Sequence, residues 1–91
     1  MKEIAKLIHN LKSEKEILKF LSEILTESEI STLTKRWRIL KMLSQKATQR
    51  EIAKTLNVGL CKVTRGAKII QDKNAITTKF LLKEKNNENS K

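Results

Sequence analysis

The chain contains no proline and no tyrosine, and its 91 residues include only two glycines, one cysteine, one histidine and one tryptophan. With so few helix-breaking residues and so few aromatics, a composition rich in Leu, Ile, Lys and Glu favours an all-α fold. A lone cysteine excludes an intramolecular disulfide and is typical of a reducing compartment. The length indicates a single domain, near the size at which the hydrophobic core of one chain is marginal.

Several kinds of chemistry are therefore not expected. One histidine, His9, and one cysteine cannot form a His/Cys metal cluster, the carboxylates are scattered, and there is no glycine-rich phosphate loop. We expect neither enzyme activity nor a metal site. Residues 1–16 contain no long apolar run, so we expect no signal peptide, no membrane span and a cytoplasmic protein.

Basic residues outnumber acidic ones by 20 to 10, which gives the chain a formal net charge of +10. On so small a chain this excess favours a polyanionic partner or an acidic surface. The alternative is a basic surface that is merely solvated and keeps the protein soluble.

Apolar residues at helical spacing predict a first helix over about residues 2–12. Three further helices are expected to begin at capping boxes, where Ser or Thr is followed three positions later by Glu. These pairs are Ser13 with Glu16, Thr26 with Glu29, and Thr48 with Glu51. The apolar stripe predicted for the third helix is Ile30, Leu33, Trp37 and Leu40, extended by Met42 and Leu43.

A last helix is predicted after the polar residues 72–74, with Ala75, Ile76, Phe80, Leu81 and Leu82 as its apolar positions. Residues 86–91 include no apolar side chain and are expected to form a disordered tail. The prediction is thus a single domain over residues 1–85, built from five to six short helices.

Residues 48–71 have the pattern of a helix-turn-helix, with helices at 49–56 and 60–71 and the motif itself at about 49–71. Between them, Asn57 and Gly59 both tolerate the left-handed backbone of a tight turn. The small Ala53 lets the two helices approach, while Val58 and Val63 fill the corner. The alternative is an ordinary helical hairpin whose polar face happens to be basic.

In a helix-turn-helix the second helix enters the DNA major groove and the first meets the backbone. Leu60, Cys61, Lys62 and Thr64 would then lie at base edges, and Gln49, Arg50 and Lys54 at phosphates. The segment from 48 to 68 carries five basic residues against the single acid Glu51: Arg50, Lys54, Lys62, Arg65 and Lys68.

These residues resemble the trp repressor family. Thr64-Arg65-Gly66 matches the family's second motif helix, and Thr48-Gln49-Arg50-Glu51 resembles the start of its first. The likeness extends back through Arg36 and Leu25-Thr26 and covers about residues 7–71, with a short deletion near Lys46-Ala47. The resemblance implies an intertwined homodimer whose two recognition helices lie about one DNA turn, ~34 Å, apart on near-palindromic double-stranded DNA.

The resemblance also implies L-tryptophan as corepressor, with its indole between Arg36 and Arg65. Thr26 would lie near the polar part of the ligand and Gly66 would leave room for it. Ile69 stands where the family has a serine that helps to hold the amino group. Another small molecule is the alternative to tryptophan, and arginines that serve only phosphates or surface pairs are the alternative to any ligand.

Two residues have competing interpretations. Trp37 is predicted in the core, with the alternative that its indole partly fills the ligand space. Cys61 is predicted to be simply small and adaptable, with the alternative of a redox-sensing thiol beside Lys62 and Arg65.

Three functions follow from this sequence. The first, which we predict, is a dimeric sequence-specific transcription repressor. The second is a nucleic-acid-binding module without ligand control, as in replication initiation or transposase end recognition. The third is an adaptor whose basic surface meets an acidic protein, which would bind DNA without sequence preference.

Overall fold

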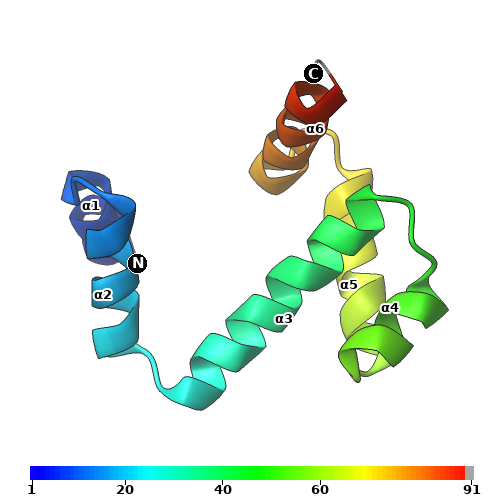
Figure 1. The fold of residues 1–91 in the computed structure, drawn as a ribbon, viewed down its shortest axis with the longest axis horizontal. Coiled ribbons are helices and arrows are strands. Elements are labelled where there is room, and N and C mark those ends of the chain that lie inside the picture. Colours follow the sequence, from blue (N-terminus) through cyan, green and yellow to red (C-terminus); the bar gives the residue numbers. More distant parts are fainter. Residues whose placement is uncertain (90–91) are drawn as a thin grey trace. The chain divides into compact units, whose positions relative to one another are not determined.

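The computed structural model describes the backbone of residues 1–89 and the side chains of residues 1–84, and within them the protein forms six α-helices and no strand (Figure 1). The helices are α1 (Lys2–Asn10), α2 (Glu14–Ile24), α3 (Glu27–Ser44), α4 (Gln49–Leu56), α5 (Leu60–Gln71) and α6 (Ile76–Asn89). The all-α prediction is confirmed. No helix of the described residues has the length and apolar character needed to cross a membrane.

The chain divides into two units, Met1–Thr32 and Leu33–Lys91, with α3 contributing to both. In the first unit the predicted capping boxes start the helices. The Ser13 hydroxyl accepts a hydrogen bond from the N–H of Glu16 at 3.2 Å. At the start of α3 the bonds are reciprocal, since the Glu29 carboxylate accepts from the Thr26 N–H at 2.9 Å and the Thr26 hydroxyl from the Glu29 N–H at 3.1 Å. The backbone N–H of Thr26, then its hydroxyl, lower the pKa of the Glu29 carboxyl.

The first unit has helices but no core. Among residues 1–32, all of which the structure describes, no side chain is buried. The apolar side chains of Leu18 and Ile24 are 59% and 53% exposed, and those of Ile4 and Leu7 are 45% and 42% exposed. Helix α1 ends at Asn10, two residues before the predicted end, where Leu11 turns to an extended conformation.

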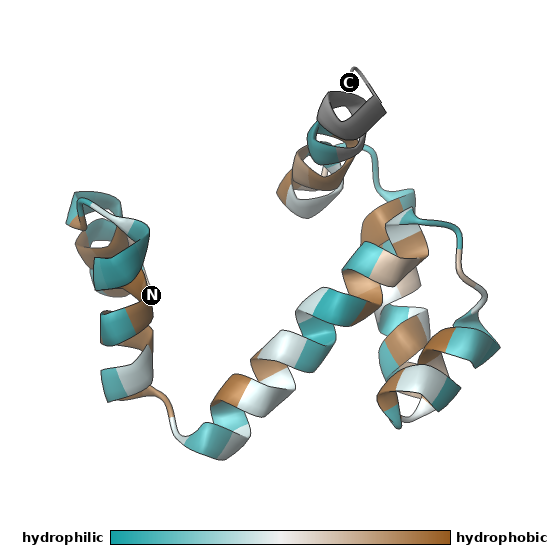
Figure 2. Cartoon of the chain, in the orientation of Figure 1, coloured by the Kyte–Doolittle hydropathy of each residue, from teal (hydrophilic) through white to brown (hydrophobic). Residues whose placement is uncertain are grey.

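The core lies in the second unit, where α3, α4 and α5 each contribute one fully enclosed residue: Ile39, Ile52 and Val63. Around these three pack Met42, Leu43, Ala47, Ala53, Leu56 and Val58. Short apolar bands alternate with hydrophilic ones along the helices of this unit (Figure 2). Val63 thus lies in this core, and Ala53 and Val58, which were predicted beside it between the two motif helices, pack against it.

The predicted stripe of α3 was wrong in its centre. It omitted Ile39, the buried residue of that helix, and it included Leu33 and Trp37, which are 50% and 38% exposed. Ile39 lies about 200° around the helix from Trp37, at about 100° per residue. The helix is thus apolar on two sides, and α4 and α5 cover the side that carries Ile39.

Helices α3 and α4 end in the same way. Lys46 (φ 68°) and Asn57 (φ 53°) adopt the left-handed conformation. The next residue closes each helix end with a hydrogen bond to a carbonyl five positions back, Ala47 to Met42 and Val58 to Ala53, both at 3.1 Å. The left-handed role predicted for Gly59 is wrong, because one such residue completes the turn and Gly59 (φ −67°) precedes α5 in an extended conformation.

Gly66 lies where α5 comes close to α3. A Cβ placed at this position would lie 2.8 Å from Ile39 Cγ2 and 3.3 Å from Leu43 Cδ1. Since both neighbours belong to the packed core, neither can move away without disturbing it. The absence of a side chain at Gly66 therefore sets the separation of the two helices.

Helix α6 is held against α5 by one buried polar contact. The Thr78 hydroxyl donates to the Ile69 carbonyl at 2.7 Å, and Leu81 of α6 and Ala67 of α5 are also buried. Helix α6 continues to Asn89, past the start of the tail predicted at residues 86–91, since its sequence contains neither proline nor glycine. Residues 90–91 of that predicted tail lie outside the described residues.

We predict that Lys46→Gly stabilises the protein by about 0.5–1 kcal/mol. The left-handed conformation costs a non-glycine residue about 1–2 kcal/mol, part of which the greater freedom of glycine in the unfolded chain offsets. Urea denaturation at a fixed protein concentration measures the change. Lys46→Ala is the control, because it removes the same side chain and keeps the strained backbone. Equal gains from both variants would contradict the prediction.

We also predict that Gly66→Ala costs about 1–3 kcal/mol of stability, the usual range for overpacking a core. Ile39→Leu removes the methyl group that the new Cβ would meet while keeping the side-chain volume. The double variant should therefore lose less stability than the two single losses added together. Strict additivity would show that the Ile39 contact does not limit the approach of the helices.

Candidate nucleic-acid interface

The exposed face of the helix-turn-helix is formed by the first turns of α5 and the outer side of α4. Val63, Gly66 and Ala67 turn α5 inward, so the side chains that the sequence predicted at base edges are left in solvent. Leu60 is 51% exposed although it is apolar, and Cys61 and Lys62 beside it are exposed as well. An exposed leucine at the first position of a helix is available for contact with a base methyl group.

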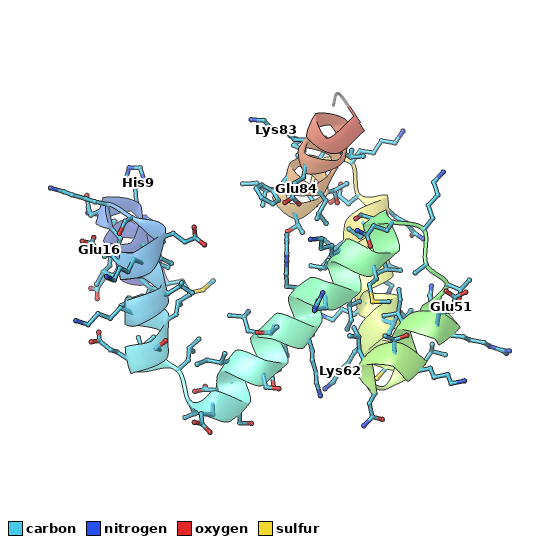
Figure 3. The ribbon with its side chains drawn as sticks, viewed as in Figure 1. His9, Glu16, Glu51, Lys62, Lys83 and Glu84 are labelled. Carbon is cyan, nitrogen blue, oxygen red and sulfur yellow. The ribbon has the colours of Figure 1, made fainter. Side chains whose placement is uncertain are left out.

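Five cations surround this face. Arg50, Lys54, Lys62, Arg65 and Lys68 are all exposed. Glu51, the single acid of residues 48–68, donates its N–H to the Thr48 hydroxyl at 3.1 Å as part of the cap of α4. In the view of Figure 3, Glu51 lies on the side of the helix pair away from Lys62.

Thr64 and Gln49, both predicted to touch DNA, also touch each other. The Thr64 hydroxyl lies 3.2 Å from Gln49 Oε1, to which it donates, and 3.1 Å from the Leu60 carbonyl. This contact links the first turn of α4 to α5 and fixes the direction of the Gln49 amide. Because the Thr64 hydroxyl already donates its proton within the motif, this hydroxyl could only accept a hydrogen bond from a nucleic acid.

A cavity of about 320 Å³ opens between α3 and α5. Its lining residues are Arg36, Ile39, Leu40, Lys62, Arg65, Gly66 and Ile69. Four of the five residues expected from the family resemblance to hold a corepressor thus come together here. The fifth, Thr26, belongs to the first unit, where its hydroxyl and N–H form the cap of α3.

The sequence interpretation missed three residues of this cavity. Ile39 and Leu40 were not expected there, and Lys62 was expected only at the DNA. Helical spacing carries the signal that would have found them. Positions 62, 65, 66 and 69 share one face of α5, and positions 36, 39 and 40 share one face of α3.

Trp37 neither lies in the core nor lines this cavity. Its ring lies 6.0 Å from that of Phe80 on α6, tilted by 58°, in the geometry that aromatic pairs prefer. The idea that its indole fills this cavity is therefore wrong. The reason is again the phase of α3, which turns Trp37 toward α6 while Arg36 and Leu40 turn toward α5.

The other candidate chemical groups lie apart. His9 is exposed in the last turn of α1, where a cation would meet the negative end of the helix dipole. Cys61 is a free, exposed thiol at the start of α5. Within the described residues, no group of three or more His, Cys, Asp or Glu side chains is placed to hold a metal ion.

Comparison with known proteins agrees with this geometry. Residues 1–85 match the family described as Trp repressor protein. Two relatives described as Trp operon repressor homolog, from Xylella fastidiosa strains M23 and Temecula1 / ATCC 700964, are each 46% identical over 52 residues. The match covers 56% of this chain and 56% of each relative, so the chain spans little more than half the length of these relatives. No solved structure matches the chain. Because the family match spans nearly the whole sequence, the chain belongs to the Trp repressor protein family.

Proposed function

We propose that the protein is a sequence-specific transcription repressor that binds an operator palindrome in double-stranded DNA as a homodimer. A small corepressor, L-tryptophan or another molecule, would occupy the cavity between α3 and α5. The observation that carries the proposal is the helix-turn-helix of α4 and α5, built on its own buried core and presenting exposed cations, in a chain that matches the Trp repressor protein family over residues 1–85.

The two helices of the motif would contact different parts of the DNA, because each presents an exposed cation in its first turn. Lys62 lies in the first turn of α5, where a helix in the major groove meets base edges. Arg50 lies in the first turn of α4, the helix that meets the phosphate backbone. A lysine can donate to guanine O6 or N7, whereas a phosphate contact carries no sequence information.

A second copy of the chain would provide the burial of apolar side chains that the first unit lacks. A helical segment that buries no side chain has little to offset the entropy of its ordering. Apolar side chains are also exposed on α6 of the second unit, where Ile76 is 83% and Phe80 55% exposed. An interlocked homodimer would bury such faces in both copies, and two recognition helices would then read a two-fold symmetric site.

The first test is the selection of bound sites from random duplex DNA. A repressor of this kind should select one palindromic motif, with or without added L-tryptophan. We expect Lys62→Ala to relax the preference for the selected motif over random DNA, by about 1–3 kcal/mol of discrimination if the contact is bidentate. Arg50→Ala should weaken binding to all sequences alike and reduce the salt slope by about 2, because each of the two copies would lose one phosphate contact.

If both variants lose affinity equally on every sequence, α5 is not the recognition helix. If the unaltered protein selects no motif and its binding to DNA is only salt-sensitive, the repressor proposal fails and the adaptor interpretation is favoured.

Association is tested separately by sedimentation over a range of protein concentrations. Leu18→Gln should raise the dimer dissociation constant at least about tenfold, because each copy would lose an apolar side chain worth about 1.5–3 kcal/mol when buried. Lys19→Gln, at the neighbouring exposed position of α2, is the matched control and should leave association unchanged. A monomeric unaltered protein would contradict the dimer, and equal effects of the two variants would show that Leu18 is not buried at its interface.

A further inference from the structure

One side-chain hydrogen bond joins the two helices of the motif at the surface. The Thr64 hydroxyl on α5 donates to Oε1 of Gln49, the first residue of α4, over 3.2 Å. The two helices are already held together by the core, in which Ile52 and Val63 are fully buried. An exposed hydrogen bond between neutral groups adds little stability to such a packed pair, because water competes for both partners. The bond matters more for the direction in which it holds the Gln49 amide.

We propose that Thr64 is a positioning residue for DNA binding, which directs the side-chain amide of Gln49 toward a backbone phosphate. This role rests on the proposed function and gives the two residues different tasks: Gln49 contacts the DNA, and Thr64 orients Gln49. By holding Oε1 within the motif, the Thr64 hydroxyl leaves the two Nε2 hydrogens of Gln49 for an acceptor outside it. Phosphate oxygens only accept hydrogen bonds, so this is the orientation in which the amide can bind one.

A free glutamine side chain can present either end of its amide to the DNA. It has several rotatable bonds, and its oxygen and nitrogen occupy similar space. With Oε1 outward, the partial negative charge of the oxygen would be repelled by the phosphate. The Thr64 hydroxyl favours the opposite orientation before DNA binds, so less conformational freedom is lost on binding. A phosphate that accepts from Nε2 also polarises the amide, which makes Oε1 a better acceptor of the Thr64 proton.

Thr64 is itself held in place. Its side chain is β-branched, which restricts rotation about the Cα–Cβ bond in a helix. Its hydroxyl also lies 3.1 Å from the Leu60 carbonyl, one turn earlier in α5, so its one proton has two acceptors within the motif. This disfavours a direct contact of the Thr64 hydroxyl with a phosphate, because both groups would then be acceptors. We therefore expect Thr64 to affect phosphate binding through Gln49.

The test is a double-mutant cycle on DNA affinity. The full chain is titrated against a duplex selected from random DNA and against a random duplex of the same length. Thr64→Val replaces the hydroxyl with a methyl group of similar size, and Gln49→Ala removes the amide. We expect Thr64→Val to weaken binding at least about threefold and Gln49→Ala at least about tenfold, on both duplexes alike. In the Gln49→Ala background, Thr64→Val should change the affinity less than about twofold.

Three controls separate positioning from folding and from the orientation of the amide. Thr64→Ser keeps the hydroxyl and should bind within about twofold of the unaltered protein. Gln49→Glu keeps an oxygen for Thr64 but has no amide hydrogen, so it should bind no better than Gln49→Ala. In urea denaturation without DNA, Thr64→Val should unfold at the same concentration as the unaltered protein, which a purely structural role would not allow.

Additive losses in the cycle would show that Thr64 does not act through Gln49 and would overturn the proposal. A Gln49→Glu variant that keeps the affinity of the unaltered protein would do the same, because the amide oxygen would then be the group that faces the DNA. A loss confined to the selected duplex would place the amide at a base edge, which also contradicts a phosphate contact.

Failure of the positioning role is separable from failure of the proposed repressor. If the protein selects no motif, the repressor proposal fails, but the cycle on the random duplex still tests Thr64, because a phosphate contact needs no particular sequence. If a motif is selected and the losses are additive, the repressor remains and the positioning role is wrong. Absence of binding to any duplex would overturn both.

Discussion

The contact on which the second unit depends is the close approach of α3 and α5 at Gly66. With no Cβ at that position, Ile39 packs against the backbone of α5, and the core of Ile39, Ile52 and Val63 closes around it. A packed interior transmits displacement because it contains few voids. A wider separation of the two helices would therefore loosen the packing of α4, change the shape of the cavity between α3 and α5, and move the face of α5 that we propose meets DNA.

This arrangement places residues of the cavity and residues of the proposed DNA-facing surface on one helix. Helix α5 turns Val63 and Ala67 into the core, Arg65 and Ile69 toward the cavity, and Leu60 and Cys61 into solvent. A molecule bound between α3 and α5 would therefore contact the same helix, α5, that would carry the recognition residues. A ligand would couple the two sites if it favoured one position of α5 over another. A difference in its affinity for the two positions is sufficient to shift their populations.

The features predicted well from the sequence are local ones. The bounds of α4 and α5 and the starts of α2 and α3 follow from hydrogen bonds between residues three or four apart, such as Thr48 with Glu51. Ile39, the ring pair of Trp37 with Phe80, and the contact of Thr64 with Gln49 were not predicted. Each joins different helices, and α3 is apolar on two sides, so its hydrophobic pattern does not reveal which side its neighbours cover. Four residues of the cavity between α3 and α5 were predicted from the family resemblance, at positions where its motifs match. Lys62 was missed there because a basic residue in the predicted recognition helix was assigned only to DNA.

In the first unit, the interactions that determine where the helices begin are not accompanied by the burial of side chains that would stabilise them. Its capping boxes determine where α2 and α3 begin, yet each cap contributes only about 1 kcal/mol, and residues 1–32 bury no side chain to add to it. Short isolated helices are marginal in water, because nucleation is costly and propagation returns little. The capping boxes of the first unit therefore define helices that gain no buried side chain within residues 1–32. If a second copy provides that burial, folding of this unit and dimer formation are one event, and its stability increases with protein concentration as mass action requires.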